Sequence, residues 1–213
     1  MGFLYWALPV LAVFLFNVRL HDYLNNMALL DTDKVLGEHQ WWRLVTSTFL
    51  HSDIGHFAAN LSIGIPLMGM AMARYGIGWT LQGTLFAGVI GNLFTLGIHP
   101  TDYRSLGASG VVMGILGLLT VYLFPLLGNG TLQKRIAMSA LAGGSLIFVL
   151  TGLSPEPNVN IGAHLGGFLG GVLAGCMLNY LPQRWISSQL ANVILTDVWM
   201  LIVCFCWFFA LDK

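Results

Sequence analysis

The sequence predicts an all-α polytopic membrane protein, a bundle of six transmembrane helices followed by a seventh. Three observations support this fold class. Hydrophobic residues make up 56% of the 213 residues and charged residues only 8%, whereas soluble domains carry about 25% charged residues. The apolar residues gather in runs close to the ~20 residues that a helix needs to cross a bilayer. Within a membrane the backbone must satisfy its own hydrogen bonds, so these runs are expected to be helical.

Seven apolar runs are expected to form these helices, at 2–17, 54–73, 78–98, 107–125, 136–153, 160–181 and 193–211. Ser52 or Asp53 can cap the start of the second helix, because a short polar side chain accepts hydrogen bonds from the free N–H groups of a first turn. Lys134 and Arg135 are expected in the loop before the fifth run. Two prolines within 154–158 cannot continue a helix and predict a turn before the sixth run.

The segment 18–50, between the first two helices, is unusually long and rich in Leu and Trp. Such a segment is expected to lie partly in the membrane interface as short amphipathic pieces. We therefore divide the chain into two parts. Residues 1–181 form a core of six helices with this long first loop, and residues 182–213 form a linker and the seventh helix.

The charged loops give a weak indication of orientation. Loops on the side where the first helix begins hold four Lys or Arg, and loops on the other side hold five, or two without the long first loop. Long loops count for little in the positive-inside rule, so the second count favours a cytoplasmic N-terminus.

The fourth run opens with Ser109 between two small residues, Ala108 and Gly110. The backbone N–H groups of a helix's first turn are free to meet a negative charge, which suits a nucleophile. A serine in a membrane helix is more often a residue that lets two helices approach closely. From this stretch alone both interpretations stay open.

Polar side chains also mark the starts of the second and sixth helices, and such groups inside spans are costly. His56 and Asn60 are four residues apart and share one helix face. His164 lies near the start of the sixth helix. Each of these residues alone has a structural interpretation, as a hydrogen-bonding contact between helices.

Glycines predict that the fourth and sixth helices pack closely. The sixth helix carries two overlapping GxxxG pairs, at 166–170 and 167–171, and the fourth offers glycines at the same kind of spacing. Close approach of the two helices would bring His164 towards Ser109. A base must lie within about 2.6–3.2 Å of the serine oxygen to take its proton. The second, fourth and sixth helices begin on one side of the membrane. A nucleophile, a base and hydrogen-bond donors at one depth predict a catalytic site.

These residues resemble the motifs of the rhomboid family of intramembrane serine proteases, and the resemblance covers roughly residues 1–181. The family's nucleophile motif GxSG appears at 107–110, and its base motif AHxxGxxxG appears at 163–171. Its HxxxN pair appears at 56–60, and its WR motif appears at 42–43 in the long first loop.

The resemblance implies a Ser–His dyad without an acidic third member. His164 would deprotonate Ser109, which would form an acyl-enzyme with a peptide carbonyl. His56, Asn60 and the backbone N–H of Ser109 would hold the oxyanion. The motifs also imply supporting positions, namely His51, Trp42, Arg43, Gly107, Gly110, Gly167 and Gly171.

The resemblance also implies partners and location. The substrate would be a transmembrane protein, cleaved near the membrane boundary where its helix can unwind. We expect contact with membrane lipid, no cofactor, no metal and no nucleic acid. The net charge of zero gives no indication of a nucleic-acid partner. The protein is expected to be an integral multi-pass protein of the bacterial inner (cell) membrane.

Two positions depart from the family's pattern. Many relatives carry a glutamate near the end of the second helix, where this chain has Met72 in the stretch 70–76. Several relatives place a tyrosine four residues after the nucleophile, where this chain has Met113. Methionine can fill the gap that the tyrosine ring leaves.

Three alternatives remain beside a protease of transmembrane helices. A non-catalytic rhomboid-like protein would bind membrane helices, but such relatives usually lack the serine or the histidine. A rhombosortase-type enzyme would trim C-terminal tails with the same dyad. A metal transporter could use His51, His56 and His164, but it would need carboxylates or thiolates among its ligands, and no HExxH motif or carboxylate pair lies in the spans.

Overall fold

The structure is a computed structural model that describes residues 2–20, 23–128, 130–153 and 159–212. Its main elements are apolar helices: α1 Leu4–Arg19, α5 Ile54–Tyr75, α6 Ile77–Ile98, α7 Ser109–Thr120, α8 Thr131–Gly152, α9 Ile161–Tyr180 and α11 Gln189–Leu211. Of these, α5, α6, α8, α9 and α11 are long and apolar enough to cross a membrane, whereas α1 and α7 are shorter. The predicted all-α polytopic membrane fold is confirmed. The turn expected at 154–158 lies outside the described residues.

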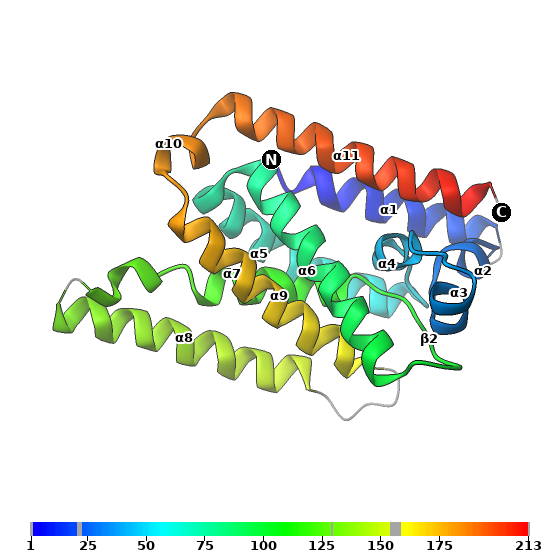
Figure 1. The fold of residues 1–213 in the computed structure, drawn as a ribbon, viewed down its shortest axis with the longest axis horizontal. Coiled ribbons are helices and arrows are strands. Elements are labelled where there is room, and N and C mark those ends of the chain that lie inside the picture. The colour runs from blue at the N-terminus through cyan, green and yellow to red at the C-terminus, as the bar shows by residue number, and fades with distance from the viewer. Residues whose placement is uncertain (1, 21–22, 129, 154–158, 213) are drawn as a thin grey trace.

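Helix α9 occupies the middle of the bundle and packs against both α6 and α7 (Figure 1). Helices α1 and α11 run along one edge, and α8 runs along the opposite edge, where it contacts α7 and α9 less extensively (Figure 1). Most of α7 is buried. The bundle therefore encloses the helix that begins at Ser109.

The two GxxxG pairs of α9 serve two different neighbours. A Cβ atom at Gly167 would collide with the carbonyl oxygen of Gly110, and one at Gly171 with that of Gly114, both on α7. A Cβ at Gly166 would come within 2.6 Å of the Phe94 side chain on α6. Backbones this close leave no room for side chains, so the predicted tight packing of α7 and α9 is confirmed.

The long first loop folds into short elements at one end of the bundle: α2 Tyr23–Ala28, β1 Leu30–Asp31, α3 Thr32–Gly37, α4 Arg43–Thr46 and the 3-10 helix η1 Ser47–Phe49. Strand β1 pairs antiparallel with β2, Arg104–Ser105, which precedes α7. Arg104 also forms an ion pair of 2.9 Å with Asp31. The ribbon therefore ties the first loop to the segment that leads into Ser109.

Three expected helix limits were wrong. The fourth helix ends at Thr120 and is followed by the 3-10 helix η2, Phe124–Gly128. Pro125 explains this break, because a proline has no N–H to bond the carbonyl four residues earlier and its ring clashes with that carbonyl, which here belongs to Val121 at the end of α7. Helix α8 begins at Thr131, so Lys134 and Arg135 lie in its first turns and not in a loop. Long basic side chains can extend from a helix end towards the interface, which makes these positions compatible with a membrane helix.

The seventh helix also begins earlier than expected, after the short helix α10, Gln183–Ile186. The Ser188 hydroxyl accepts a hydrogen bond from the Ala191 N–H and caps the start of α11. Asn192 and Gln82 then bind α11 to α6, since the Gly78 N–H donates to Asn192 Oδ1 and Gln82 Nε2 donates to the Leu195 carbonyl. Polar contacts of this kind hold membrane helices together.

Candidate active site

Ser109 is the first residue of α7 and follows a turn that only glycine suits. Gly107 has φ +136°, and its N–H donates to the Ser47 carbonyl at 3.0 Å. A Cβ on Gly107 would lie 2.7 Å from the His56 ring, so a side chain here would displace that ring. The first N–H groups of α7 have no partner within the helix and remain available to a ligand.

His164 is buried in the first turn of α9, and its tautomer is set by a backbone carbonyl. His164 Nδ1 lies 2.8 Å from the Gly152 carbonyl oxygen at the end of α8. A carbonyl can only accept, so Nδ1 carries the proton in this contact. In the neutral ring Nε2 is then the unprotonated nitrogen, which is the form a general base requires.

Neighbouring backbone atoms bring the starts of α7 and α9 together. A Cβ at Gly110 would lie 3.2 Å from the Ala163 carbonyl oxygen. Gly110 directly follows Ser109, and Ala163 directly precedes His164. In the described part of the chain the Ser109 hydroxyl makes no hydrogen bond. Catalytic hydrogen bonds are often long before a substrate binds, so this geometry is compatible with a dyad.

His56 and Asn60 lie on the face of α5 that borders this site. His56 Nε2 and Ser109 Oγ both lie within 4 Å of the position a Gly107 Cβ would take. Asn60 is buried, and its Nδ2 donates to the His56 carbonyl at 3.0 Å. An amide nitrogen has two N–H groups, so one donor of Asn60 remains for another acceptor.

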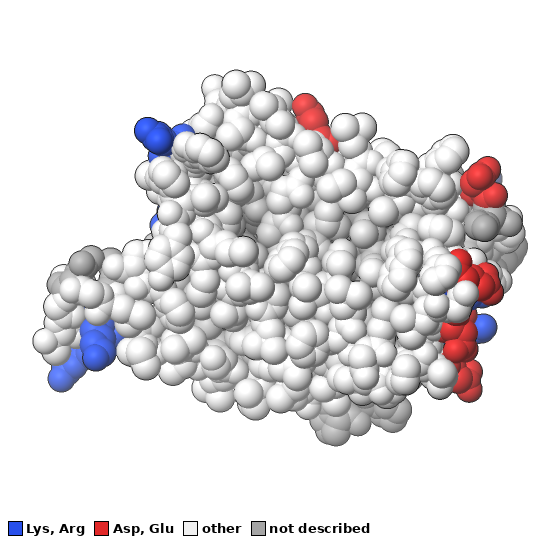
Figure 2. Space-filling view, viewed as in Figure 1, with Lys and Arg blue, Asp and Glu red and all other residues white. Residues whose placement is uncertain are grey.

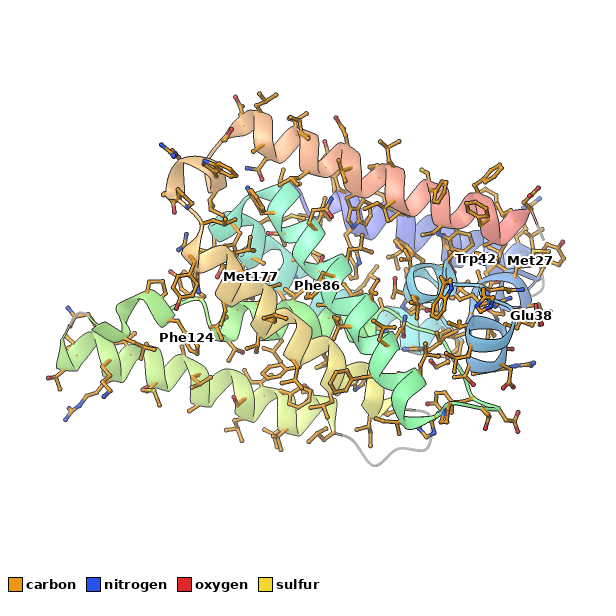
Figure 3. The ribbon with its side chains drawn as sticks, viewed as in Figure 1. Met27, Glu38, Trp42, Phe86, Phe124 and Met177 are labelled. Carbon is orange, nitrogen blue, oxygen red and sulfur yellow. The ribbon has the colours of Figure 1, made fainter. Side chains whose placement is uncertain are left out.

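Two of the other predicted positions, Arg43 and Trp42, lie in the first loop and support it. Arg43 is 2% exposed, and its guanidinium donates to Gln40 Oε1 and to the carbonyls of Asn26 and Leu29. Burial lowers the pKa of Arg43, while the charges of Asp31 and Glu38 oppose this effect. Trp42 stacks on Phe209 of α11, with ring centroids 5.8 Å apart. Figure 3 shows Trp42 near Glu38 at the loop end of the bundle.

His51 lies in the apolar surroundings behind His56, with their ring centroids 5.1 Å apart. Its ring is 1% exposed and meets Phe14 and Phe57 edge-on. Burial, together with the neighbouring His56, lowers the pKa of His51 to about 4. His51 is therefore neutral at pH 7.

Sequence reasoning included Asn160 in the polar stretch at the start of the sixth helix but assigned it no role, and the structure shows that it connects elements of the site. Asn160 caps α9 through Oδ1, which accepts from the Ala163 N–H, and the same oxygen accepts from the Thr95 hydroxyl of α6. Its Nδ2 donates to Ser105 Oγ in strand β2. An asparagine directly before an apolar helix is a known cap pattern, but the contacts to Thr95 and Ser105 join residues far apart in the chain.

The two departures from the family's pattern are both buried in apolar clusters. Met72 belongs to the main core. Met113 packs with Leu116, Phe148 and Phe168 between α7, α8 and α9. Its sulfur lies 3.3 Å from the position of a Cβ at Gly152, whose carbonyl holds His164. Met113 therefore fills space beside the histidine's backbone partner.

No group of three or more His, Cys, Asp or Glu side chains in the described residues could hold a metal ion. His51, His56 and His164 have no carboxylate or thiolate completing such a set. A borderline ion such as zinc would require three or four ligands at about 2.0–2.3 Å.

Comparison with known proteins identifies the fold. The family model described as the rhomboid domain matches residues 38–181, from the end of α3 to the end of α9. The chain belongs to the rhomboid family. The helices α1 and α11 lie outside this match, on either side of the rhomboid domain.

Several relatives of this rhomboid protein have been named. One, "Putative rhomboid protease YdcA" of Bacillus subtilis, is 34% identical over 59% of this chain and 61% of its own length. Rhomboid protease GluP of the same organism is 34% identical over 55% of this chain and 23% of its own. RHOMBOID-like protein 7 of Arabidopsis thaliana is 30% identical over 79% of this chain and 53% of its own. The matched parts thus cover less than two thirds of these relatives.

Proposed function

We propose that this protein is an intramembrane serine endopeptidase that cleaves transmembrane helices near the membrane boundary, in the cell membrane of a bacterium. The observation that carries the proposal is the tautomer of His164. The Nδ1–H of His164 donates to the Gly152 carbonyl, so in the neutral ring Nε2 is unprotonated and can act as a base on the helix packed against the start of α7.

In the proposed mechanism, His164 Nε2 takes the proton of the Ser109 hydroxyl as Oγ attacks the substrate's peptide carbonyl. The peptide C–N bond then breaks, and His164 returns the proton to the leaving amine. Water hydrolyses the acyl-enzyme in a second step that uses the same base. The Ser109 N–H, Asn60 Nδ2 and His56 Nε2 are the proposed oxyanion donors, and losing one such donor typically costs about 10²–10³ in rate.

A fluorophosphonate probe tests this proposal, because it labels an activated serine covalently. We expect labelling of the detergent-solubilised protein, none in Ser109→Ala, and a loss of about 10²-fold or more in labelling rate in His164→Ala. Ser62→Ala is a suitable control, since Ser62 is an exposed serine of α5 that bonds the Ala59 carbonyl. Undiminished labelling of Ser109→Ala would overturn the assignment, and an unlabelled wild type would favour a binding protein.

A further inference from the structure

A short chain of hydrogen bonds links an exposed carboxylate to the ring of His56. Asp53 caps α5, and its Oδ1 accepts from the His56 N–H at 2.9 Å. Its other oxygen, Oδ2, accepts from the Ser52 hydroxyl at 2.7 Å. Ser52 Oγ lies 3.2 Å from His56 Nδ1. Asp53, Ser52 and His56 are thus joined in series.

The direction of each hydrogen bond follows from the number of protons available. Hydrogen bonds from the His56 N–H and the Ser52 hydroxyl lower the pKa of Asp53, which is ionised and can only accept. The single hydroxyl proton of Ser52 is therefore used on Asp53. Ser52 Oγ must then accept from His56, so Nδ1 carries a proton. A neutral His56 in this arrangement has a lone pair, and no N–H, at Nε2.

Nε2 is the nitrogen of His56 that faces the turn before Ser109, since it lies 2.8 Å from the position of a Gly107 Cβ. A developing oxyanion beside Ser109 needs a donor there, and a lone pair would repel it. With the Asp53–Ser52 chain intact, the ring can donate from Nε2 only as an imidazolium, which has a proton on both nitrogens.

We propose that Asp53, acting through Ser52, stabilises the imidazolium form of His56 and so supplies an N–H at Nε2 to the oxyanion. Ser52 and Asp53 are positioning residues in this scheme, which rests on the proposed protease function. The extra proton is taken up from water before the substrate is attacked and is not transferred to the substrate. No bond of the substrate changes in this step.

Two other titratable groups face His56 and bear on whether its ring is neutral or an imidazolium. His51, on the loop behind it, is held neutral by burial and adds no opposing charge at pH 7. His164, on α9, is close enough for its charge to act on His56. Burial of the His56 ring disfavours the imidazolium and a proton on His164 would oppose it further, whereas the carboxylate of Asp53 favours it. Of these effects, the attraction between the Asp53 carboxylate and the imidazolium is the one that a single substitution can remove without changing a histidine.

Asp53→Asn separates charge from capping, because asparagine caps a helix about as well as aspartate. We expect the variant to fold with an unchanged melting temperature. Without the carboxylate the Ser52 hydroxyl is free to donate to His56 Nδ1, so a neutral ring can carry its proton on Nε2. The kcat of the variant on a transmembrane substrate in detergent should therefore no longer depend on the imidazolium, and its alkaline limb should shift to higher pH than that of the wild type. KM should stay unchanged. Ser52→Ala, which breaks the chain differently, should give the same shift.

Asp33→Asn is the matched control, since Asp33 is an exposed carboxylate of the first loop whose Oδ2 accepts from the Asp102 N–H. Its pH profile should match that of the wild type. Profiles of Asp53→Asn and Ser52→Ala that overlay the wild type would overturn the relay while leaving the protease assignment intact. Failure of the protease assignment itself would appear separately, as a wild type that neither labels at Ser109 nor cleaves substrate.

Discussion

Single buried side chains fix the backbone around the site. The guanidinium of Arg43 donates to carbonyls of the first loop, and a backbone carbonyl holds the ring of His164. His51 differs from both, because in the described structure neither of its ring nitrogens makes a well-aligned hydrogen bond. Its surroundings are aromatic rings, which disfavour a charged imidazole.

His51 should make the protein sensitive to mild acid. Its pKa is about 4 in the folded protein and about 6.5 when unfolded. The unfolded chain therefore binds a proton more readily, and stability is lost as the pH falls from about 6.5 towards about 4. The loss is at most about 3 kcal/mol.

Thermal unfolding in detergent at pH 7.5 and pH 5 measures this effect. The melting temperature of the wild type should fall more between the two values than that of His51→Gln, which does not titrate. His99→Gln, which changes an exposed histidine, should behave as the wild type. Parallel decreases in the wild type and His51→Gln would contradict the prediction.

The sequence predicted some contacts of the site residues and missed others for a physical reason. The turn at Gly107 and the helix start at Ser109 could be predicted from the local sequence, since neighbouring residues determine where a helix begins and how the chain turns before it. The carbonyl of Gly152 could not, because every residue has a carbonyl and only the fold selects this one for His164. The series of Asp53, Ser52 and His56 lies within residues 52–56, yet from the sequence Asp53 had only a capping role, because the side-chain contacts that join the three depend on rotamers that sequence does not specify.

Among the elements, α7 departs most from an ordinary membrane helix. Its 12 residues reach about 18 Å, well short of the ~30 Å of a bilayer's hydrocarbon core. Composition alone predicted a run to residue 125, because apolar residues continue past the helix end. A short helix inside a ring of longer ones lets Ser109 lie away from lipid, where irregular backbone is tolerated.

The glycines of α9 give a prediction at the scale of helix packing. Gly167→Ala would place a methyl group against the Gly110 carbonyl oxygen, and two packed backbones cannot move apart locally. We expect a loss of about 1–3 kcal/mol or more in unfolding free energy, with loss of Ser109 labelling. The measurement is unfolding by denaturant in mixed micelles.

Gly143→Ala on α8 is the control, since a Cβ there would meet nothing within 4 Å. Alanine's higher helix propensity should make this variant equal to or up to about 1 kcal/mol more stable than the wild type. The packing argument fails if both variants change stability by the same amount.

The whole molecule has a charge asymmetry along the bundle. Figure 2 shows Lys and Arg at the end where α10 lies and α8 begins, and most visible Asp and Glu at the opposite end, near α2 and α3. The basic group consists of Arg74, Lys134, Arg135 and Arg184. At the acidic end Arg43 is buried on loop carbonyls and Arg104 is paired with Asp31, while Arg19 and Lys34 also lie at this end. The structure thus strengthens the weak preference that the loop counts gave.

This asymmetry predicts that the basic end faces the cytoplasm, because Lys and Arg near span ends are retained on that side. Helices α7 and α9 begin at the acidic end, so the candidate site should open away from the cytoplasm. Single cysteines test this in a variant whose three native cysteines are alanine. In intact bacteria a membrane-impermeant maleimide should label Asp33→Cys and spare Lys134→Cys, both exposed positions, and inverted vesicles should show the reverse. Labelling of Lys134→Cys alone in intact cells would place the site on the cytoplasmic side and refute the predicted orientation.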